Sequence, residues 1–373
     1  MFKIKGTGLF LFVVTAYIFS ALSIGDEIEY SGYWFDNRYS TKVMNTSFSL
    51  DKTIKSNTNL SVDIEMDQVS EPPLALGRTV DGTTGASRPE RQTWEKSDTR
   101  QLNRGQIIFG MNQQMGSNTN MGFNLYTSQE IDYDSRAASV NFTQDLRQKN
   151  FKVSASAQYT QDRVGFLNTN ALSFRNKTIQ KGELSFLQLL SPTSYLIVGT
   201  LGEVHQGFLS NPYRKVDVNS YEIHPNYRFR SAAWVKLGKY FSLINGAVLL
   251  KYRYYQDDWS LKSHMGEFTI NKNITSNLSI SAKMRNYQQT AVYFYKTRTE
   301  ANYYSLDEKL AKLQANSFGF SVTWYLRGMV SEKSDYSFLK GTSIYIRYYR
   351  YFNDVKPIAY TSNIFDYRLR FEF

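Results

Sequence analysis

The chain has 373 residues, no Cys, and 44 Lys and Arg residues against 33 Asp and Glu residues, which gives a net charge of +11. Without Cys it cannot form disulfides, Cys-ligated zinc sites, iron–sulfur clusters or covalent c-type haem. The positive charge is compatible with nucleic-acid binding. The basic residues are dispersed, however, and an export signal precedes them, so we expect no nucleic-acid partner and no cofactor.

Residues 1–23 have the three parts of a secretory signal peptide. Two Lys residues come first, a short apolar core follows, and Ala21-Leu22-Ser23 offers small residues at the place of cleavage. The apolar core is shorter than the roughly 20 residues of a transmembrane helix, although a retained N-terminal anchor is the alternative. We therefore predict a cleavable signal peptide, export, and a mature chain of residues 24–373.

Beyond the signal peptide, apolar and polar residues alternate in segments of about ten residues or slightly more, a pattern that predicts strands with one apolar face. No apolar run there reaches helix-spanning length, and 16% of the chain is aromatic, with 28 Tyr and 25 Phe. Aromatic girdles are typical of transmembrane barrels. We predict an all-β fold, a single antiparallel transmembrane β-barrel of about sixteen strands. The clearest alternation is in 60–66, 121–125, 140–142, 151–159, 278–284 and 318–326.

Short and long connections alternate between these segments. Short polar connections fall near 55–58, 116–118, 147–150, 191–194, 242–246 and 273–277, with a longer one at 328–340. Short periplasmic turns, longer external loops and two periplasmic termini form the pattern of bacterial outer-membrane barrels. The long external loops are expected near 70–100, 163–177, 207–226 and 289–315. Within them, 307–315 predicts a short amphipathic helix, and 216–223 fits either a strand extension or a loop.

If the apolar series face lipid, the residues between them face the lumen. The third strand then carries an acidic wall of Asp63, Glu65 and Asp67. A broader basic wall consists of Arg228, Arg230, Lys251, Arg253, Lys283, Arg285, Arg347, Arg368 and Arg370. Series of Arg and Lys favour anions in pores, so we expect a porin-like channel for small polar or anionic solutes. The alternative is that these charges pair across the lumen of a closed or narrow barrel.

A predicted hairpin tip near 256–260 carries a specific polar group, Asp257 and Asp258 beside Trp259, with His264 following. Two adjacent carboxylates can contribute to a Ca²⁺ site, but a spaced ligand array is missing. An Asp-rich turn whose side chains bond local amides is the simpler interpretation. We expect His264 to face the lumen, bonded to a carboxylate or a Tyr, with a metal or proton-relay role as the alternative.

A barrel hydrolase is a further functional possibility, because Ser263 adjoins His264. Nucleophilic catalysis needs Ser and His within hydrogen-bond reach, and sequential residues of a strand point to opposite faces. Ser279 or Ser281 across the hairpin is the remaining option. Nothing in the sequence requires such a site, so we expect no enzymatic activity and no catalytic residues.

Several segments carry a family resemblance. They are Tyr252-Arg253-Tyr254-Tyr255, Asp257-Asp258-Trp259, Ser263-His264, Thr84-Gly85-Ala86-Ser87 and His224-Pro225-Asn226-Tyr227-Arg228-Phe229-Arg230. Over most of residues 30–373 the chain resembles an uncharacterised family of Gram-negative outer-membrane proteins, described as a domain of unknown function. The resemblance implies a bacterial outer-membrane barrel encoded beside thioredoxin-like and flavin-transferase proteins. It thereby suggests a second function, a structural barrel that anchors or sheathes a periplasmic or surface partner in envelope redox or metal biology.

The stretch 362–373 has strict alternation and is expected to close the barrel. Its polar residues Arg368 and Arg370 are expected to face Glu27 and Glu29 of the first strand across the closure. Its outward series resembles the C-terminal signature that the barrel-assembly machinery recognises, and consists of Tyr367, Leu369, Phe371 and Phe373. The lipid bilayer and the assembly machinery are therefore the expected partners.

Overall fold

The computed structural model describes residues 26–37, 42–71, 100–130, 132–168, 171–211, 215–217, 220–327, 337–353 and 360–373. The predicted signal peptide and most of the predicted 70–100 loop, including Thr84-Gly85-Ala86-Ser87, lie outside these residues. None of the described helices has the length and apolarity needed to cross a bilayer.

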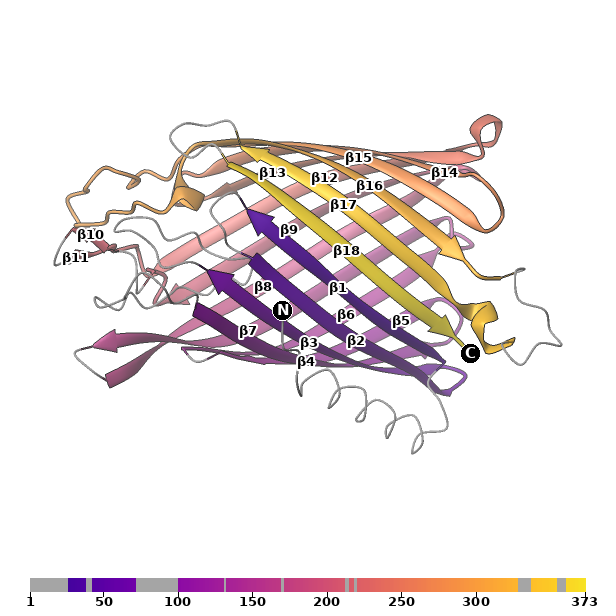
Figure 1. Ribbon diagram of the computed structural model, residues 1–373, viewed down its shortest axis with the longest axis horizontal. Coiled ribbons are helices and arrows are strands. Elements are labelled where there is room, and N and C mark those ends of the chain that lie inside the picture. Colours follow the sequence, from indigo (N-terminus) through magenta and orange to yellow (C-terminus); the bar gives the residue numbers. More distant parts are fainter. Residues whose placement is uncertain are drawn as a thin grey trace, which may run out of the picture.

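Sixteen strands form one closed antiparallel barrel, which confirms the predicted all-β fold and strand number (Figure 1). Neighbours in the barrel are neighbours in the chain, except that β9 pairs with β12, and β10 and β11 form a separate small sheet between them. The strands are β1 (Glu27–Asn37), β2 (Lys42–Lys55), β3 (Thr58–Glu71), β4 (Arg100–Met115), β5 (Thr119–Gln129), β6 (Tyr133–Leu146), β7 (Phe151–Asn168), β8 (Ala171–Ser191), β9 (Ser194–Gly207), β10 (Lys215–Asp217), β11 (Ser220–Tyr221), β12 (Tyr227–Phe241), β13 (Gly246–Asp257), β14 (Lys262–Asn273), β15 (Leu278–Gln289), β16 (Leu313–Tyr325), β17 (Ser343–Asn353) and β18 (Tyr360–Glu372).

Side chains alternate between the outside and the inside of the barrel along the strands, as the period-two pattern predicts. In β5, Met121, Phe123 and Leu125 are exposed apolar side chains on the outside. Between them, Asn124 faces inward and donates to Ser139 of β6 at 3.3 Å. The outward series gives the barrel an apolar belt, which is the surface that a bilayer requires.

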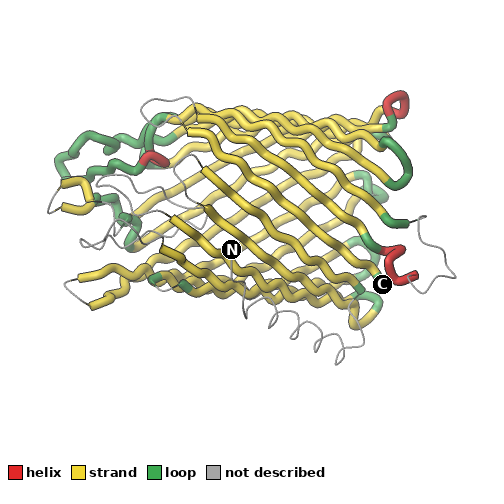
Figure 2. Tube along the Cα trace, in the orientation of Figure 1, coloured by secondary structure: helices red, strands yellow, loops and turns green. Residues whose placement is uncertain are grey.

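The two ends of the barrel differ in their connections (Figure 2). At one end, called the turn end, strands are joined by short turns such as 56–57 and 116–118, and the C-terminus of β18 lies there (Figure 1). The other end, called the loop end, carries β10 and β11 and the 290–312 segment between β15 and β16. The loop end carries the long 290–312 connection but also the short 258–261 turn, so connection length does not alternate strictly around the barrel.

The 163–177 stretch, predicted to be a loop, is instead a continuation of two strands. Pairing between β7 and β8 extends as far as Asn168 and Ala171. Across this extension Arg163 lies over the Phe174 ring, 4.6 Å from its centroid. Adjacent strands thus keep their backbone hydrogen bonds past the barrel rim, and a cross-strand side-chain contact supports them.

The predicted helix at 307–315 is reduced to a single turn. Only the 3₁₀ helix η2 (Glu308–Leu310) forms, because β16 already begins at Leu313 and pairs with β15 from there. Edge-to-edge pairing in the barrel satisfies backbone groups that a short helix would leave open at its ends. The 216–223 stretch contributes to the β10–β11 sheet.

Inward-facing aromatic side chains lie over glycines of neighbouring strands. Trp234 of β12 covers Gly199 of β9, its direct partner, so that a Cβ on this glycine would overlap the indole ring. Tyr195 covers Gly238 in the same way. Each glycine lets a ring lie flat against the inner wall, which packs the sheet without a protruding side chain.

Gly199→Ala should destabilise the folded barrel, because the added methyl group meets the Trp234 ring. Overpacking of this kind costs about 1–3 kcal/mol, so the barrel should unfold at a lower urea concentration. Heat-modifiable migration of the purified barrel in SDS gels measures the folded fraction. Gly182→Ala on β8 is the matched control, since a Cβ there meets no atom within 4 Å. Equal stability of the two variants would contradict the packing argument.

Candidate functional site

A cavity of about 640 Å³ lies inside the barrel at the loop end. Its wall is the inner face of β6–β9 and β12–β15, and its cover is the 208–211 connection together with the 290–312 segment, called the cap. Four arginines line it, namely Arg228, Arg230, Arg253 and Arg285. Basic side chains therefore converge on a partly open space near the mouth of the barrel, which the carboxylates Glu203 and Asp307 also line.

An apolar cluster holds the cap on the inner wall. Phe294 is fully buried and contacts Trp259 edge-on, with ring centroids 5.1 Å apart. Val292 and Leu310 of the cap belong to the same cluster as Leu201 of β9. Removal of a buried Phe side chain costs about 3–5 kcal/mol, so this cluster is sufficient to fix the cap over the mouth.

Hydrogen bonds tie the cap to the connection between β9 and β12. Ile223 and Tyr304 exchange backbone bonds of 3.1 and 2.9 Å, and the buried Ser305 hydroxyl donates to Glu222 at 2.8 Å. Desolvation in the cap raises the pKa of the Tyr293 phenol above its ordinary value. Cap and connection thus form one lid-like layer above the cavity.

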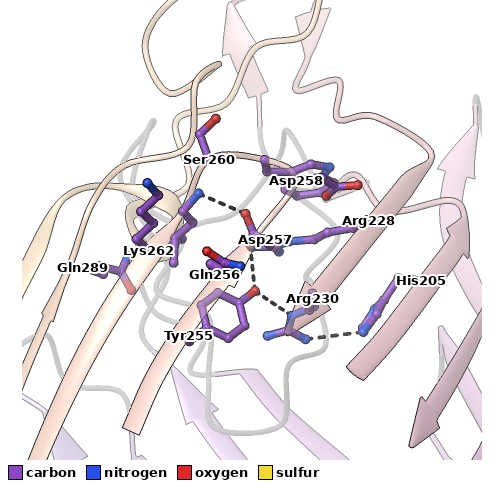
Figure 3. Close-up of polar contacts among 12 residues, drawn as sticks. His205, Arg228, Arg230, Tyr255, Gln256, Asp257, Asp258, Ser260, Lys262 and Gln289 are labelled. Carbon is purple, nitrogen blue, oxygen red and sulfur yellow. Dashed lines mark hydrogen bonds and ion pairs between the residues drawn. The ribbon is translucent and has the colours of Figure 1, made fainter. Parts of the chain in front are cut away.

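Asp257, at the tip of the β13–β14 hairpin, organises the upper wall of the cavity (Figure 3). Its buried carboxylate accepts Arg228 Nε and Nη2 at 2.9 and 2.5 Å, the Tyr255 hydroxyl at 2.7 Å and the Leu261 backbone N–H at 3.0 Å. The Arg228 guanidinium also lies over the Trp259 ring, 4.2 Å from its centroid. One carboxylate therefore fixes two strands and the hairpin turn.

A second set of contacts continues along the wall from Tyr255 (Figure 3). Arg230 Nε donates to the Tyr255 hydroxyl at 2.8 Å, and its Nη1 lies 3.1 Å from the Glu203 carboxylate. His205 Nε2 lies 3.3 Å from Glu203 and 3.4 Å from Arg230. The charge of Arg230 is thus matched by a carboxylate of the adjacent strand.

Asp258 has a different partner from Asp257, although the two are adjacent in the sequence. Its carboxylate accepts the Phe229 backbone N–H at 3.0 Å. Within the described residues, no group of three or more His, Cys, Asp or Glu side chains is placed to hold a metal ion. The Asp257–Asp258 pair therefore acts here through hydrogen bonds to its own hairpin and to β12.

His264 lies on the outer face of β14 and not in the lumen, so that prediction was wrong. The flanking Ser263 and Met265 are buried on the inside, and the cross-strand partner of His264 is Tyr254. Its Nδ1 lies 2.6 Å from the Tyr252 hydroxyl. The length of the turn between β13 and β14 decides whether the odd-numbered or the even-numbered residues of β14 face inward. Alternation within β14 alone does not show which of the two sets faces inward. Ser263 and His264 point to opposite sides of the wall.

The nine residues of the predicted basic wall lie on the inward parity of their strands, and most of them are paired. The pairs are Arg228–Asp257, Arg230–Glu203, Lys283–Glu267, Arg347–Asp366, Arg368–Glu29 and Arg370–Glu27. The remaining three, Lys251, Arg253 and Arg285, have no ion pair with a described carboxylate. The predicted basic wall therefore has two parts, one in which the cations form ion pairs and one in which they do not.

The predicted acidic wall of Asp63, Glu65 and Asp67 is largely occupied by hydrogen bonds. The buried Asp67 forms a 2.6 Å ion pair with Arg104 of β4. Asn45 of β2 donates to both Glu65 and Asp67, at 2.5 and 2.8 Å. These residues bind β2, β3 and β4 together on the inside of the barrel.

The closing strand carries charge inside and aromatic residues outside. Arg370 contacts Glu27 at 2.5 Å and Arg368 contacts Glu29 at 3.0 Å across the seam with β1. On the outer face, Tyr367, Leu369 and Phe371, which are predicted to belong to an assembly signal, lie opposite Gly32, Tyr30 and Ile28, and the Phe373 backbone N–H donates to Asp26 at 3.0 Å. The seam is therefore ionic toward the lumen and apolar toward lipid.

Sequence reasoning missed several residues of the inner wall, among them the carboxylates Glu203 and Glu267. Lys236 has the same inward parity as Arg228 and Arg230 along β12, so extension of that series would have found it. His205 and Tyr287 line the cavity, but neither lies in a pattern that distinguishes it from other strand residues.

One family model and several solved structures match the chain. A family model described as "Protein of unknown function (DUF3570)" matches residues 26–176 and 165–338, and no curated protein matches the chain. A structure titled "Bacterial polysaccharide outer membrane secretin" has a TM-score of 0.54 at 7% identity, over 93% of this chain and 98% of that one. A ferric enterobactin receptor (PfeA) from Pseudomonas aeruginosa gives 0.48 at 10% identity, over 90% of this chain and 54% of the receptor. A BenF-like porin from Pseudomonas fluorescens Pf-5 gives 0.47 at 7% identity, over 93% and 98%. The first similarity shows the fold of an outer-membrane barrel.

Asp257→Ala should destabilise the loop end, because Arg228 is left as an unpaired charge and the hairpin turn loses its acceptor. Loss of one partner of a buried ion pair costs about 3–5 kcal/mol. The expected readouts are a lower urea midpoint and faster proteolysis at the 256–262 tip. Asp258→Ala removes one hydrogen bond from an exposed carboxylate, worth about 0.5–1.5 kcal/mol, and is the matched control. Equal effects of the two substitutions would contradict the role assigned to Asp257.

Proposed function

We propose, for a chain that belongs to the DUF3570 family of unknown function, that the barrel is a porin-like channel for small polar solutes and favours anions among them. The observation that carries this proposal is a group of inward cations on β12, β13 and β15. They are called the basic strip and consist of Lys236, Lys251, Arg253, Lys283 and Arg285.

Two members of the basic strip face each other directly. Lys236 of β12 and Lys251 of β13 are cross-strand partners on the inner face, and neither has an ion pair with a described carboxylate. Like charges directly opposite one another destabilise a sheet in a dry environment. Their position opposite one another fits a lumen that contains water or exchangeable anions, because water and anions both reduce the repulsion between the two lysines.

A single carboxylate lies within the basic strip. Glu267 of β14 is the direct partner of Lys251 on one side and of Arg285 on the other, and it forms a 2.9 Å ion pair with Lys283. Five cations against one carboxylate leave the strip with a net charge of +4 among these residues. This excess distinguishes β12–β15 from the seam, where Arg368 and Arg370 each have a Glu partner.

An unbalanced positive strip on a low-dielectric wall attracts anions and repels cations in the lumen. It extends from the cavity at the loop end, where Arg253 and Arg285 lie, toward the middle of the barrel at Lys236 and Lys251. With the loop end outside and the turn end in the periplasm, as in outer-membrane barrels, this order places the positive potential along a path from the mouth inward.

Purified protein in planar bilayers should conduct, and its reversal potential in a KCl gradient should show preference for chloride over potassium. Lys236→Gln/Lys251→Gln should shift this preference toward cations, because it removes two of the unpaired charges while leaving Glu267 in place. The effect should weaken in high salt, where the Debye length falls to about 3 Å at 1 M.

The matched control is Lys55→Gln/Lys149→Gln, which removes the same charge from exposed positions at two turns. This variant should keep the selectivity of the unmodified barrel. An absence of both conductance and solute flux would refute the channel, and cation selectivity of the unmodified barrel would refute the preference for anions.

A further inference from the structure

We propose that the cavity under the cap is a binding site for an organic carboxylate, whose carboxylate is held by Arg253 and Arg285 and whose apolar part contacts the apolar lining residues of the cavity. This inference rests on the proposed function, since it names the class of solute that the channel would take up.

Arg253 is a cavity-lining cation whose donors are incompletely used. Its Nε is buried and has no hydrogen-bond partner among the described residues. On the inner face it lies between Trp234 of β12 and Met265 of β14, its cross-strand partners, and neither of these is a carboxylate. A buried donor without an acceptor costs free energy, and a bound carboxylate would supply that acceptor.

Arg285 is a second cavity-lining cation without an ion pair, and it is more exposed than Arg253. Its direct partner on β14 is Glu267, but that carboxylate contacts Lys283 at 2.9 Å, and Arg285 forms no ion pair within the described part of the chain. Its guanidinium lies 5.9 Å from the Tyr287 ring centroid. Arg253 and Arg285 thus reach the cavity from β13 and β15, on either side of β14.

The other two cavity arginines are already occupied. Arg228 is bound by Asp257 at 2.5 Å, and Arg230 contacts Glu203 at 3.1 Å. A ligand that displaced these contacts would leave a carboxylate unpaired. The available planar donors are therefore those of Arg253 and Arg285, and a guanidinium matches the geometry of a carboxylate through two parallel hydrogen bonds.

The remainder of the lining sets the size and character of the ligand. Leu201, Leu261, Met265 and Leu310 contribute apolar surface, and the volume of about 640 Å³ lies in the range of roughly 300–1,000 Å³ of pockets for drug-sized molecules. A single chloride or phosphate would leave most of this space and all of the apolar surface without contacts. An anion with a carboxylate at one end and an apolar body fills both parts.

The test is an equilibrium titration of the purified full chain in detergent micelles with 3-phenylpropionate, followed by tryptophan fluorescence, because Trp259 lines the cavity. The neutral 3-phenylpropionamide, of nearly the same shape, and inorganic phosphate are titrated in parallel. We expect saturable binding of the carboxylate and at least about tenfold weaker binding of the amide, since a charge-assisted hydrogen bond contributes strongly. Equal binding of carboxylate and amide, or binding of phosphate alone, would overturn the proposal without any substitution.

Arg253→Gln/Arg285→Gln should weaken carboxylate binding at least about tenfold, as a loss of two charged donors requires. Arg253→Lys/Arg285→Lys, which keeps the charge but not the planar donor pair, should bind less tightly than the unmodified barrel. Lys55→Gln/Lys149→Gln is the control of equal charge and should bind normally. Unchanged affinity in the Gln variant, with its barrel shown to be folded by heat-modifiable migration, would refute the site. Micelle binding does not depend on conductance, so binding without conductance refutes only the channel, and anion-selective conductance without binding refutes only the site.

Discussion

The pairing of β1 with β18 is the constraint on which the rest of the barrel depends. Water is absent from a bilayer core, so each backbone N–H and C=O there must pair within the sheet, and only closure removes both free edges. The observed register runs from Glu27 opposite Glu372 to Asn37 opposite Ser362. A slip by one residue would turn Arg368 and Arg370 toward lipid, where a basic residue is unfavourable by an amount that falls toward the membrane interfaces. The backbone bonds between β1 and β18 close the barrel, and the charges at the seam select the register of that pairing.

Once the register is fixed, the inner wall divides into sectors with different electrostatics. Around the seam each cation has a carboxylate across the strand boundary, as Arg370 has Glu27. In β5 and β6 the inward residues include neutral, hydrogen-bonded side chains such as Asn124 and Ser139. Across β12–β15, inward cations outnumber inward carboxylates among the described residues. The basic strip is a small part of the total of 44 basic residues. It nevertheless determines the local potential, because ion pairs elsewhere on the inner wall neutralise most of the charge there.

The closed barrel and its strand number follow from the sequence because period-two alternation and turn length are local properties. Features that depend on relations between strands do not follow. The outward side of His264 was missed because the β13–β14 tip sets its parity, and the helix expected at 307–315 yielded to pairing of β16 with β15. The basic wall was predicted from alternation alone, whereas the choice of partner for Glu267, which contacts Lys283 instead of Lys251 or Arg285, is a diagonal side-chain relation that no strand pattern encodes.

The arginines that line the cavity differ in whether a neighbouring carboxylate binds them. Asp257 accepts from Arg228, Tyr255 and the Leu261 backbone, so Arg228 is a structural residue that holds the hairpin beneath the cap. Arg253 lies on the same strand as Asp257 and lines the same cavity as Arg228. Its cross-strand partners, however, are Trp234 and Met265, neither of which is acidic. A guanidinium stays charged at any ordinary pH, so one that has no carboxylate partner in a partly apolar space needs solvent or a ligand to accept its hydrogen bonds. The contrast between these two arginines is the reason to assign stability to one and ligand binding to the other.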